Sequence, residues 1–284
     1  MKNLIKISII GIVAIAITSC KKEGCTDSEA INYNSEAQKD DGSCQYETTT
    51  TPTPTSNLFE IGSGSTTSGE TVKLYADESL TAGYTNLYAE VKNVNGDIVD
   101  NASVTFTPLM DMTTMQHSAP VIQPSYNSST QKYEGAVIFQ MSSMAGTWTI
   151  DVLVDGNPTT ITATVAETDT KVVGVYPGTD SENYIISIVR PVNWVVGQQD
   201  LKLMVHRKET MMSFPAVTDL EIALTPEMVS MGHGSTGNID PIHTVNGLYT
   251  GTVNLSMAGD WRFHLELSKN GTVIHSDAFL DILF

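Results

Sequence analysis

The sequence predicts an all-β protein: two immunoglobulin-like β-sandwich domains in tandem, after a short disulfide-stapled N-terminal segment and a tether. Three observations predict this architecture. The chain has 284 residues, of which 40% are hydrophobic, which is enough for two cores. Apolar and polar residues alternate at the period of a β-strand, with no amphipathic helical stretch of useful length. The sequence also contains an internal repeat, in which one module occurs twice along the chain.

The composition excludes several classes of protein. Fifteen Lys and Arg stand against 32 Asp and Glu, a formal charge of −17. Nucleic acid is therefore not expected as a partner, because phosphate binding needs a basic surface. Three Cys are too few for a disulfide scaffold or a thiolate zinc cluster.

Residues 1–20 predict an export signal. A positive start is followed by an apolar run, Ile7 to Ile17, that is too short to span a membrane. The run ends in Ile-Thr-Ser-Cys, which resembles the lipobox of bacterial lipoproteins and implies cleavage before Cys20 and its acylation. The resemblance implies a bacterial envelope protein, lipid-anchored to the outer membrane and either periplasmic or surface-exposed. An ordinary secretory signal with an incidental Cys is the alternative.

Residues 21–46 hold the other two cysteines, Cys25 and Cys44. In an oxidising compartment a disulfide between them would stabilise the segment by about 3 kcal/mol on the chain-entropy model. Calcium binding is the other interpretation of its acidic residues, but their spacing fits no EF-hand loop. We expect a disulfide-stapled knob.

Residues 47–57 are mainly Thr and Pro, with no apolar residue to bury. Such a segment predicts an extended tether, spanning up to about 30 Å at about 3.1 Å per residue. It would hold the folded part away from the membrane.

Two domains, residues 58–168 and 171–284, are predicted from the repeat, whose period is a little over 110 residues. Its landmarks recur in one order: Thr107-Pro108-Leu109-Met110 as Thr225-Pro226-Glu227-Met228, Met115-Gln116-His117 as Met231-Gly232-His233, Tyr133-Glu134-Gly135 as Tyr249-Thr250-Gly251, and Met144-Ala145-Gly146-Thr147-Trp148 as Met257-Ala258-Gly259-Asp260-Trp261. We call these domains copy one and copy two.

Each copy has the signals of short antiparallel strands. Apolar residues alternate with polar ones after a Trp in both copies, at Trp148, Ile150, Val152 and Val154 and at Trp261, Phe263, Leu265 and Leu267. An earlier strand is predicted by Leu87, Ala89 and Val91 and by Leu201, Leu203 and Val205. Hairpin turns are predicted at Asp155-Gly156, Asn270-Gly271 and Asn95-Gly96, because these residues tolerate positive φ. About 110 such residues per copy favour a sandwich whose core is centred on the Trp.

Methionines cluster at corresponding positions of the two copies. A Met-x-x-Met-x-His pattern occurs as Met112, Met115, His117 and as Met228, Met231, His233. Thioethers with an imidazole favour Cu(I) over zinc, calcium or magnesium. On an extended strand residues i and i+2 project to one side, so each Met-x-His pair can converge, whereas the earlier Met needs a bend.

Core packing is the alternative interpretation, since Met fills irregular gaps in cores. Polar neighbours such as Thr113, Thr114 and Gln116 argue against it for the Met-x-His segments. Met141 and Met257 lie in apolar strands, and we expect them in the core. Two questions stay open: whether Met141 or Met144 is the counterpart of Met257, and whether Met110 competes with Met112 in copy one.

These residues resemble a family. The Pro-x-Met start, the Met-x-His step, the Tyr-x-Gly strand and the Gly-x-Trp corner are similar to the YtkA-like domains, relatives of FixH-type domains, over residues 80–167 and 194–284. The resemblance implies an immunoglobulin-like sandwich and metal handling in the bacterial envelope. His243 has no counterpart in copy one, so a site that used it would be specific to copy two.

No enzyme motif is present: no Gly-x-Ser-x-Gly elbow, no His-Glu-x-x-His and no phosphate-binding glycine loop. We therefore predict an envelope lipoprotein, not an enzyme, that binds copper or another soft metal through its Met/His loops for buffering or delivery. Its partners would be the membrane, through the anchor, and a metal ion or envelope protein. The alternative is a surface-displayed interaction or adhesion module without a metal site.

Overall fold

The computed structural model describes residues 22, 26, 35–40, 58–190 and 192–284. The chain divides into two compact units, residues 1–53 and 54–284, and each is described by itself. In the first unit the amide of Gln38 donates a hydrogen bond to the carbonyl of Lys22, at 2.8 Å. Among the described residues, there is no helix that is long and apolar enough to cross a membrane.

Several predictions from the N-terminal sequence fall outside the described residues. They are the export signal with its acylated Cys20, the disulfide between Cys25 and Cys44, and the tether over residues 47–57. These stay predictions.

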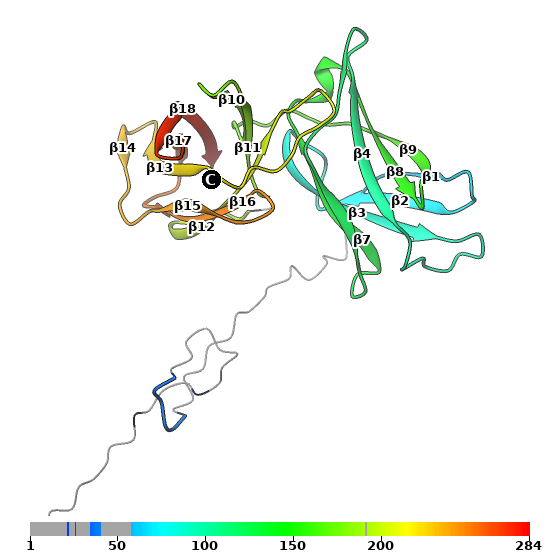
Figure 1. The fold of residues 1–284 in the computed structure, drawn as a ribbon, viewed down its shortest axis with the longest axis horizontal. Helices are drawn as coiled ribbons and strands as arrows, with labels where there is room; N and C mark the ends of the chain where they lie inside the picture. The colour runs from blue at the N-terminus through cyan, green and yellow to red at the C-terminus, as the bar shows by residue number, and fades with distance from the viewer. Residues whose placement is uncertain (1–21, 23–25, 27–34, 41–57, 191) are drawn as a thin grey trace, which may run out of the picture. The chain divides into compact units, whose positions relative to one another are not determined.

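The first sandwich contains strands β1 to β9 (Figure 1). One sheet has the order β1-β2-β3-β7-β6, with bounds Phe59–Ser65, Thr71–Ala76, Gly83–Lys92, Lys132–Phe139 and Val121–Asn127. The other has the order β5-β4-β8-β9, with bounds Gln116–His117, Val104–Asp111, Thr147–Val154 and Asn157–Ala163. A single 3₁₀ turn, Ser143–Ala145, precedes β8.

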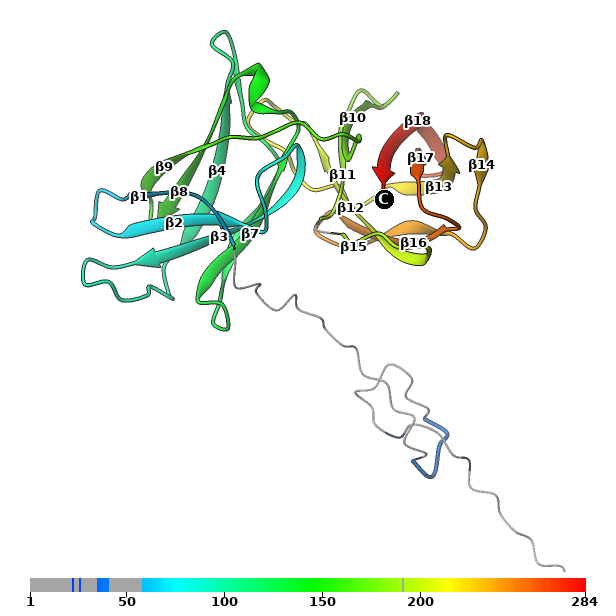
Figure 2. The same ribbon diagram turned by 180° about the vertical axis from the view of Figure 1, so that it is seen from behind.

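The second sandwich contains strands β10 to β18 and repeats this topology (Figure 2). Its five-stranded sheet has the order β10-β11-β12-β16-β15, with bounds Val173–Pro177, Asn183–Ile188, Gly197–Arg207, Leu248–Leu255 and Ile239–Val245. Its four-stranded sheet has the order β14-β13-β17-β18, with bounds His233–Gly234, Glu221–Met228, Asp260–Lys269 and Thr272–Leu283. The predicted all-β fold of two tandem immunoglobulin-like sandwiches is confirmed.

The predicted alternation places the expected residues in the cores. Trp148 and Trp261 are both fully buried, and the apolar residues that alternate after them are 0–1% exposed. Each sandwich has its own cluster of buried apolar side chains, one around each Trp. Burial of a large aromatic side chain contributes several kcal/mol by the area rule, so each Trp stabilises its own sandwich.

Two of the three predicted tight turns have the backbone that the sequence demands. Asp155-Gly156 has φ values of 48° and 83°, and Asn270-Gly271 has 51° and 72°, as in a two-residue hairpin of type I′. At the third turn only Gly96 has positive φ, at 88°. Asn93 shapes that turn instead, since its side-chain carbonyl accepts hydrogen bonds from the amides of Asn95 and Asp97.

The Tyr-x-Gly landmark has a structural cause in both copies. Both β6 and β15 contain a bulge, and its backbone lies directly over the Gly on the next strand. A Cβ on Gly135 would lie 2.6 Å from the carbonyl oxygen of Ile122, and one on Gly251 would lie 2.5 Å from that of Ile239. Only Gly therefore fits either position without displacing the neighbouring backbone.

The two sandwiches pack against each other through a third apolar cluster. Ile138 of the first sandwich and Ile185 and Met204 of the second form its buried part. These residues lie on the faces of the two five-stranded sheets that point away from the cores.

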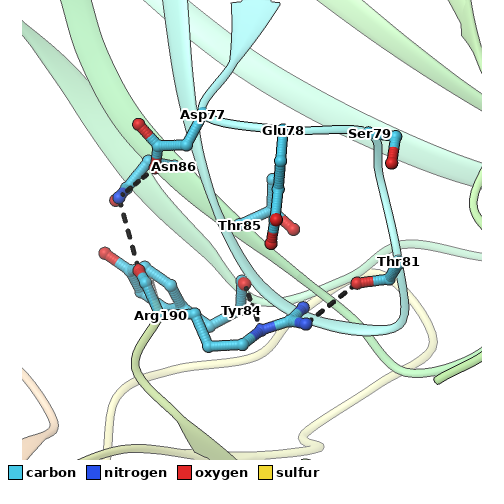
Figure 3. A pocket seen from close by; sticks show the side chains of 8 residues that line it. All are labelled: Asp77, Glu78, Ser79, Thr81, Tyr84, Thr85, Asn86 and Arg190. Carbon is cyan, nitrogen blue, oxygen red and sulfur yellow. Dashed lines mark hydrogen bonds between the residues drawn. The ribbon is translucent and has the colours of Figure 1, made fainter. Parts of the chain in front are cut away.

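Arg190 anchors the same junction (Figure 3). Its guanidinium donates hydrogen bonds to the hydroxyl of Thr81 at 2.9 Å, the carbonyl of Ala82 at 2.9 Å and the carbonyl of Tyr84 at 3.2 Å. The cavity beside it holds only about 10 Å³, room for about one water molecule. This polar cluster is therefore a structural contact.

Candidate functional site

The first Met/His segment is a tight hairpin. Strands β4 and β5 pair with Met110 opposite His117 and Asp111 opposite Gln116. The turn between them has Thr113 at φ 70°, and the amide of Met112 donates to the carbonyl of Met115 at 3.0 Å. This turn supplies the bend that the sequence pattern required.

His117 is held in one tautomer. Its Nδ1 lies 2.7 Å from the carbonyl oxygen of Ser118, which can only accept, so Nδ1 carries the proton. Nε2 is then left with a lone pair, and this buried atom has no hydrogen-bond partner. The ring is 8% exposed and packs edge-on against Trp148, with ring centroids 5.4 Å apart. A carbonyl that fixes Nδ1–H is how proteins prepare the other nitrogen for a metal.

The predicted residues of copy one line a single cavity. This cavity, of about 220 Å³, lies between the sandwiches, and the first sandwich contributes Met112, Met115, His117, Gln140 and Met141. The second sandwich contributes Val175, Ile185, Lys208, Met211 and Phe214. Four methionines and one histidine thus line the same cavity.

Two of the four methionines that line the cavity were not among the predicted metal ligands. Met141 was expected in the core, and it is half-buried, packed against the core while also lining the cavity. Met211 was missed altogether, because it comes from the other copy. The sequence contained one indication of Met211: the connection that follows β12 is longer than the connection that follows β3.

The second Met/His segment has the same chemistry in a different setting. Nδ1 of His233 lies 3.1 Å from the carbonyl of Gly234, and its ring packs edge-on against Trp261, at 6.0 Å. Met231, however, is 60% exposed, and His233 is half-exposed. Figures 1 and 2 both place β14, which begins at His233, on the side of the second sandwich that points away from the first.

The Met-x-x-Met-x-His pattern matched Met112 with Met228, and this match is wrong, whereas the repeat landmark that matched Met110 with Met228 is confirmed. Met228 lies opposite Trp261 and His233, the register that Met110 occupies opposite Trp148 and His117. Both Met110 and Met228 are buried in their cores. Two extra residues in the copy-one turn displace Met112 beyond this register, so Met228 packs in the core and copy two has no equivalent of Met112.

The Trp corner decides whether Met141 or Met144 is the counterpart of Met257. The indole N–H of Trp148 donates to the carbonyl of Met141 at 3.0 Å, and that of Trp261 donates to the carbonyl of Met257 at 2.9 Å. Met141 is therefore the counterpart of Met257, and Met144 belongs to the extra turn and is 83% exposed. Met257 is 37% exposed, so the expectation that it lies in the core is wrong.

His243 does not join either Met/His segment. Its Nε2 accepts a hydrogen bond from the amide of Gly247 at 3.4 Å, and its ring packs edge-on against Tyr249. Its contacts stabilise the β15–β16 hairpin.

The donor set at the cavity fits a soft ion and not a hard one. Among the described residues, no group of three or more His, Cys, Asp or Glu is placed to hold a metal ion. Calcium and magnesium need several oxygen ligands, and zinc sites are built from His, Cys and carboxylates. Thioether sulfur and a neutral imidazole suit Cu(I), and the unpartnered Nε2 of His117 is the donor such an ion would use.

Comparison with known proteins finds a family similarity in the second sandwich. A family model described as YtkA-like matches residues 179–266, so this part of copy two is similar to a YtkA-like domain. The matched part includes Met228, Met231 and His233. No curated protein matches the sequence.

Solved structures resemble the tandem only distantly. The Escherichia coli adhesin FdeC is 15% identical, with a TM-score of 0.26, over 78% of this chain and 66% of that one. Invasin, a bacterial integrin-binding protein, is 15% identical, with a TM-score of 0.25, over 71% of this chain and 37% of that one. The titin immunoglobulin tandem A164–A165 is 13% identical, with a TM-score of 0.19, over 72% of this chain and 90% of that one.

Proposed function

We propose that this protein binds a soft monovalent metal ion, Cu(I), at the Met/His hairpin of copy one, for buffering or delivery and without turnover. One observation carries the proposal: the buried Nε2 of His117, which has no partner, beside a cavity lined by four methionines. An unsatisfied buried polar atom costs about 1–3 kcal/mol, and a metal ion would satisfy this one.

Titration of the full chain with Cu(I) against a soft-metal competitor tests the proposal. We expect submicromolar binding, and a loss of at least tenfold in affinity for His117→Ala, which corresponds to about 1.4 kcal/mol. His233→Ala is the matched control, because His233 has the same tautomer and the same Trp contact but lies in an open setting. No binding tighter than micromolar by the wild type would disprove the proposal.

His117→Ala also removes a ring that packs on Trp148, so its effect alone could reflect altered packing. Met115→Leu separates the two effects. Leu fills a similar volume without sulfur, and Met115 is 43% exposed, so the fold should keep its stability. Metal affinity should still fall, and unchanged affinity in this variant would count against thioether ligation.

A protein-interaction module is the second candidate, and the exposed edge strand β15 favours it. Three large apolar side chains are exposed on this strand: Ile239, Ile242 and Val245. Strand β15 pairs only with β16, so one of its edges lacks a partner strand among the described residues. A partner that adds a strand there would protect the amides of β15 from hydrogen exchange, whereas Cu(I) would leave those amides unchanged.

We also propose that Cys20 is the acylated end of the mature chain and anchors it to the outer membrane. The sequence of the export signal supports this proposal. Cys20→Ala should then abolish acyl labelling and release the protein from membranes. Labelling that persists in the variant would disprove the anchor.

A further inference from the structure

The connection between β12 and β13 differs from its counterpart in copy one. An isolated bridge joins His206 to Ala216, whereas the equivalent bridge in copy one joins Lys92 to Ile98. The longer connection, residues 206–216, is named the arm. In Figure 1 the arm, drawn in yellow, extends from the second sandwich to the first.

Hydrogen bonds within the arm make it an ordered hairpin. The amide of Arg207 donates to the carbonyl of Pro215, and that of Glu209 donates to the carbonyl of Ser213, both at 3.0 Å. The hydroxyl of Ser213 returns a bond to the carboxylate of Glu209 at 2.8 Å. Met211 therefore lies at the tip of a defined turn.

The tip is bound to the segment that carries His117. The amide of Ser118 donates to the carbonyl of Met211 at 2.8 Å, and the carbonyl of the same Ser118 accepts the Nδ1 proton of His117. Phe214 fixes the other side of the arm, since it packs on the apolar cluster between the sandwiches. The backbones of Met211 and His117 are thus held together, and both side chains line the cavity.

We propose that the metal site is shared between the two sandwiches, with Met211 supplying a thioether ligand that completes the set of Met112, Met115, Met141 and His117. This inference rests on the proposed function. The site is then complete only when the sandwiches are docked, and a metal ion in it holds them together. An ion that binds only the docked state stabilises docking to the same degree that docking raises its affinity.

The positive charge of Lys208 at the cavity favours a metal ion of low charge. The five donors are neutral, and Lys208 also lines the cavity and brings a positive charge. Coulomb repulsion from one ammonium is twice as large for a divalent ion as for a monovalent one at the same distance. The geometry therefore favours Cu(I) or Ag(I) over soft divalent ions, and Lys208→Gln should raise the affinity for either.

The test uses the full chain with ¹³C-labelled methionine methyl groups and Ag(I) as a probe that does not change oxidation state. Ag(I) should shift the methyl resonances of Met112, Met115, Met141 and Met211. The resonances of Met144 and Met212 should stay in place, because neither residue lines this cavity. Met211→Leu should lower Cu(I) affinity tenfold or more, and Met212→Leu, its exposed neighbour, should leave it unchanged.

Arg190 gives an independent variant, since it anchors the junction without lining the cavity. Arg190→Gln should weaken docking and lower Cu(I) affinity with it. Wild-type binding with an unmoved Met211 resonance and full affinity in Met211→Leu would overturn the shared site and leave the proposed function standing. Absence of wild-type binding would overturn the proposed function itself.

Discussion

The Met/His hairpins of the two copies have the same local arrangement, but their surroundings differ. In both, a short strand brings His edge-on to the core Trp, and a backbone carbonyl holds the Nδ1 proton. In copy one the other sandwich covers the hairpin, and the ring is 8% exposed. In copy two the ring of His233 is half-exposed, and Met231 at the turn is 60% exposed, compared with 43% for Met115. The repeat therefore supplies the Met/His hairpin, and the junction between the copies supplies its enclosure in copy one.

The largest effects test whether the two cores are equivalent. Trp148→Ala and Trp261→Ala should each cost about 3–5 kcal/mol, because both side chains are fully buried and donate a hydrogen bond from the indole. Hydrogen exchange measured strand by strand should locate the loss mainly in the mutated sandwich. A loss spread equally over both would show that the copies unfold as one unit.

The next-largest effect on stability is expected at His206, a position where the two copies differ. His206 of β12 is buried and its Nδ1 has no partner, whereas Lys92, at the same register of β3, is half-buried and pairs with Glu90. Burial lowers the pKa of His206 from 6.5 to about 4. Desolvation causes this shift, since the charged ring loses its hydration there.

Because the folded pKa lies below the unfolded one, the unfolded state takes up the proton first as the pH falls. The contribution of His206 is complete above about pH 6.5 and is lost between there and pH 4, by about 3 kcal/mol. Chemical denaturation at a series of pH values measures this loss. His206→Leu should flatten the profile over that range, and an unchanged slope would contradict the assignment.

A smaller loss of stability, of equal size in the two copies, is expected from substitutions beside the bulges of β6 and β15. Gly135→Ala and Gly251→Ala place a Cβ within 2.6 and 2.5 Å of a carbonyl oxygen, so the neighbouring strand must move. We expect each to cost about 1–3 kcal/mol, the usual cost of overpacking. Thermal unfolding of the two variants measures it. Unequal losses would show that β6 and β15 differ in how freely their bulges shift.

The sequence predicted what depends on local pattern. Alternation around Trp148 and Trp261 located the core strands, and the Asp-Gly and Asn-Gly pairs located two hairpins, because pleating and positive φ are local properties. The grouping of Met112, Met115 and His117 was also visible, since the three residues are close in the chain. The repeat itself predicted two domains of the same topology.

Register and contacts between the copies were not predictable in the same way. Nothing in the local pattern decided whether Met110 or Met112 is the core residue, and pairing with Trp148 across β8 decides it. Met211 reaches the cavity through a contact between segments far apart in the chain, which no periodicity encodes. The candidate ligands within copy one were therefore accessible from the sequence, and the residue that closes the site was not.

The smallest expected effect separates core methionines from exposed ones within one copy. Met231→Ala should change the free energy of unfolding by no more than about 0.5 kcal/mol, because its side chain is 60% exposed and leaves no cavity. Met228→Ala, the matched variant three residues earlier, should cost about 2–5 kcal/mol, since Met228 is 6% exposed and packs in the core. Urea denaturation of both variants measures the difference. A large loss for Met231→Ala would mean that the copy-two turn is packed, and the contrast between an enclosed and an open Met/His hairpin would then no longer hold.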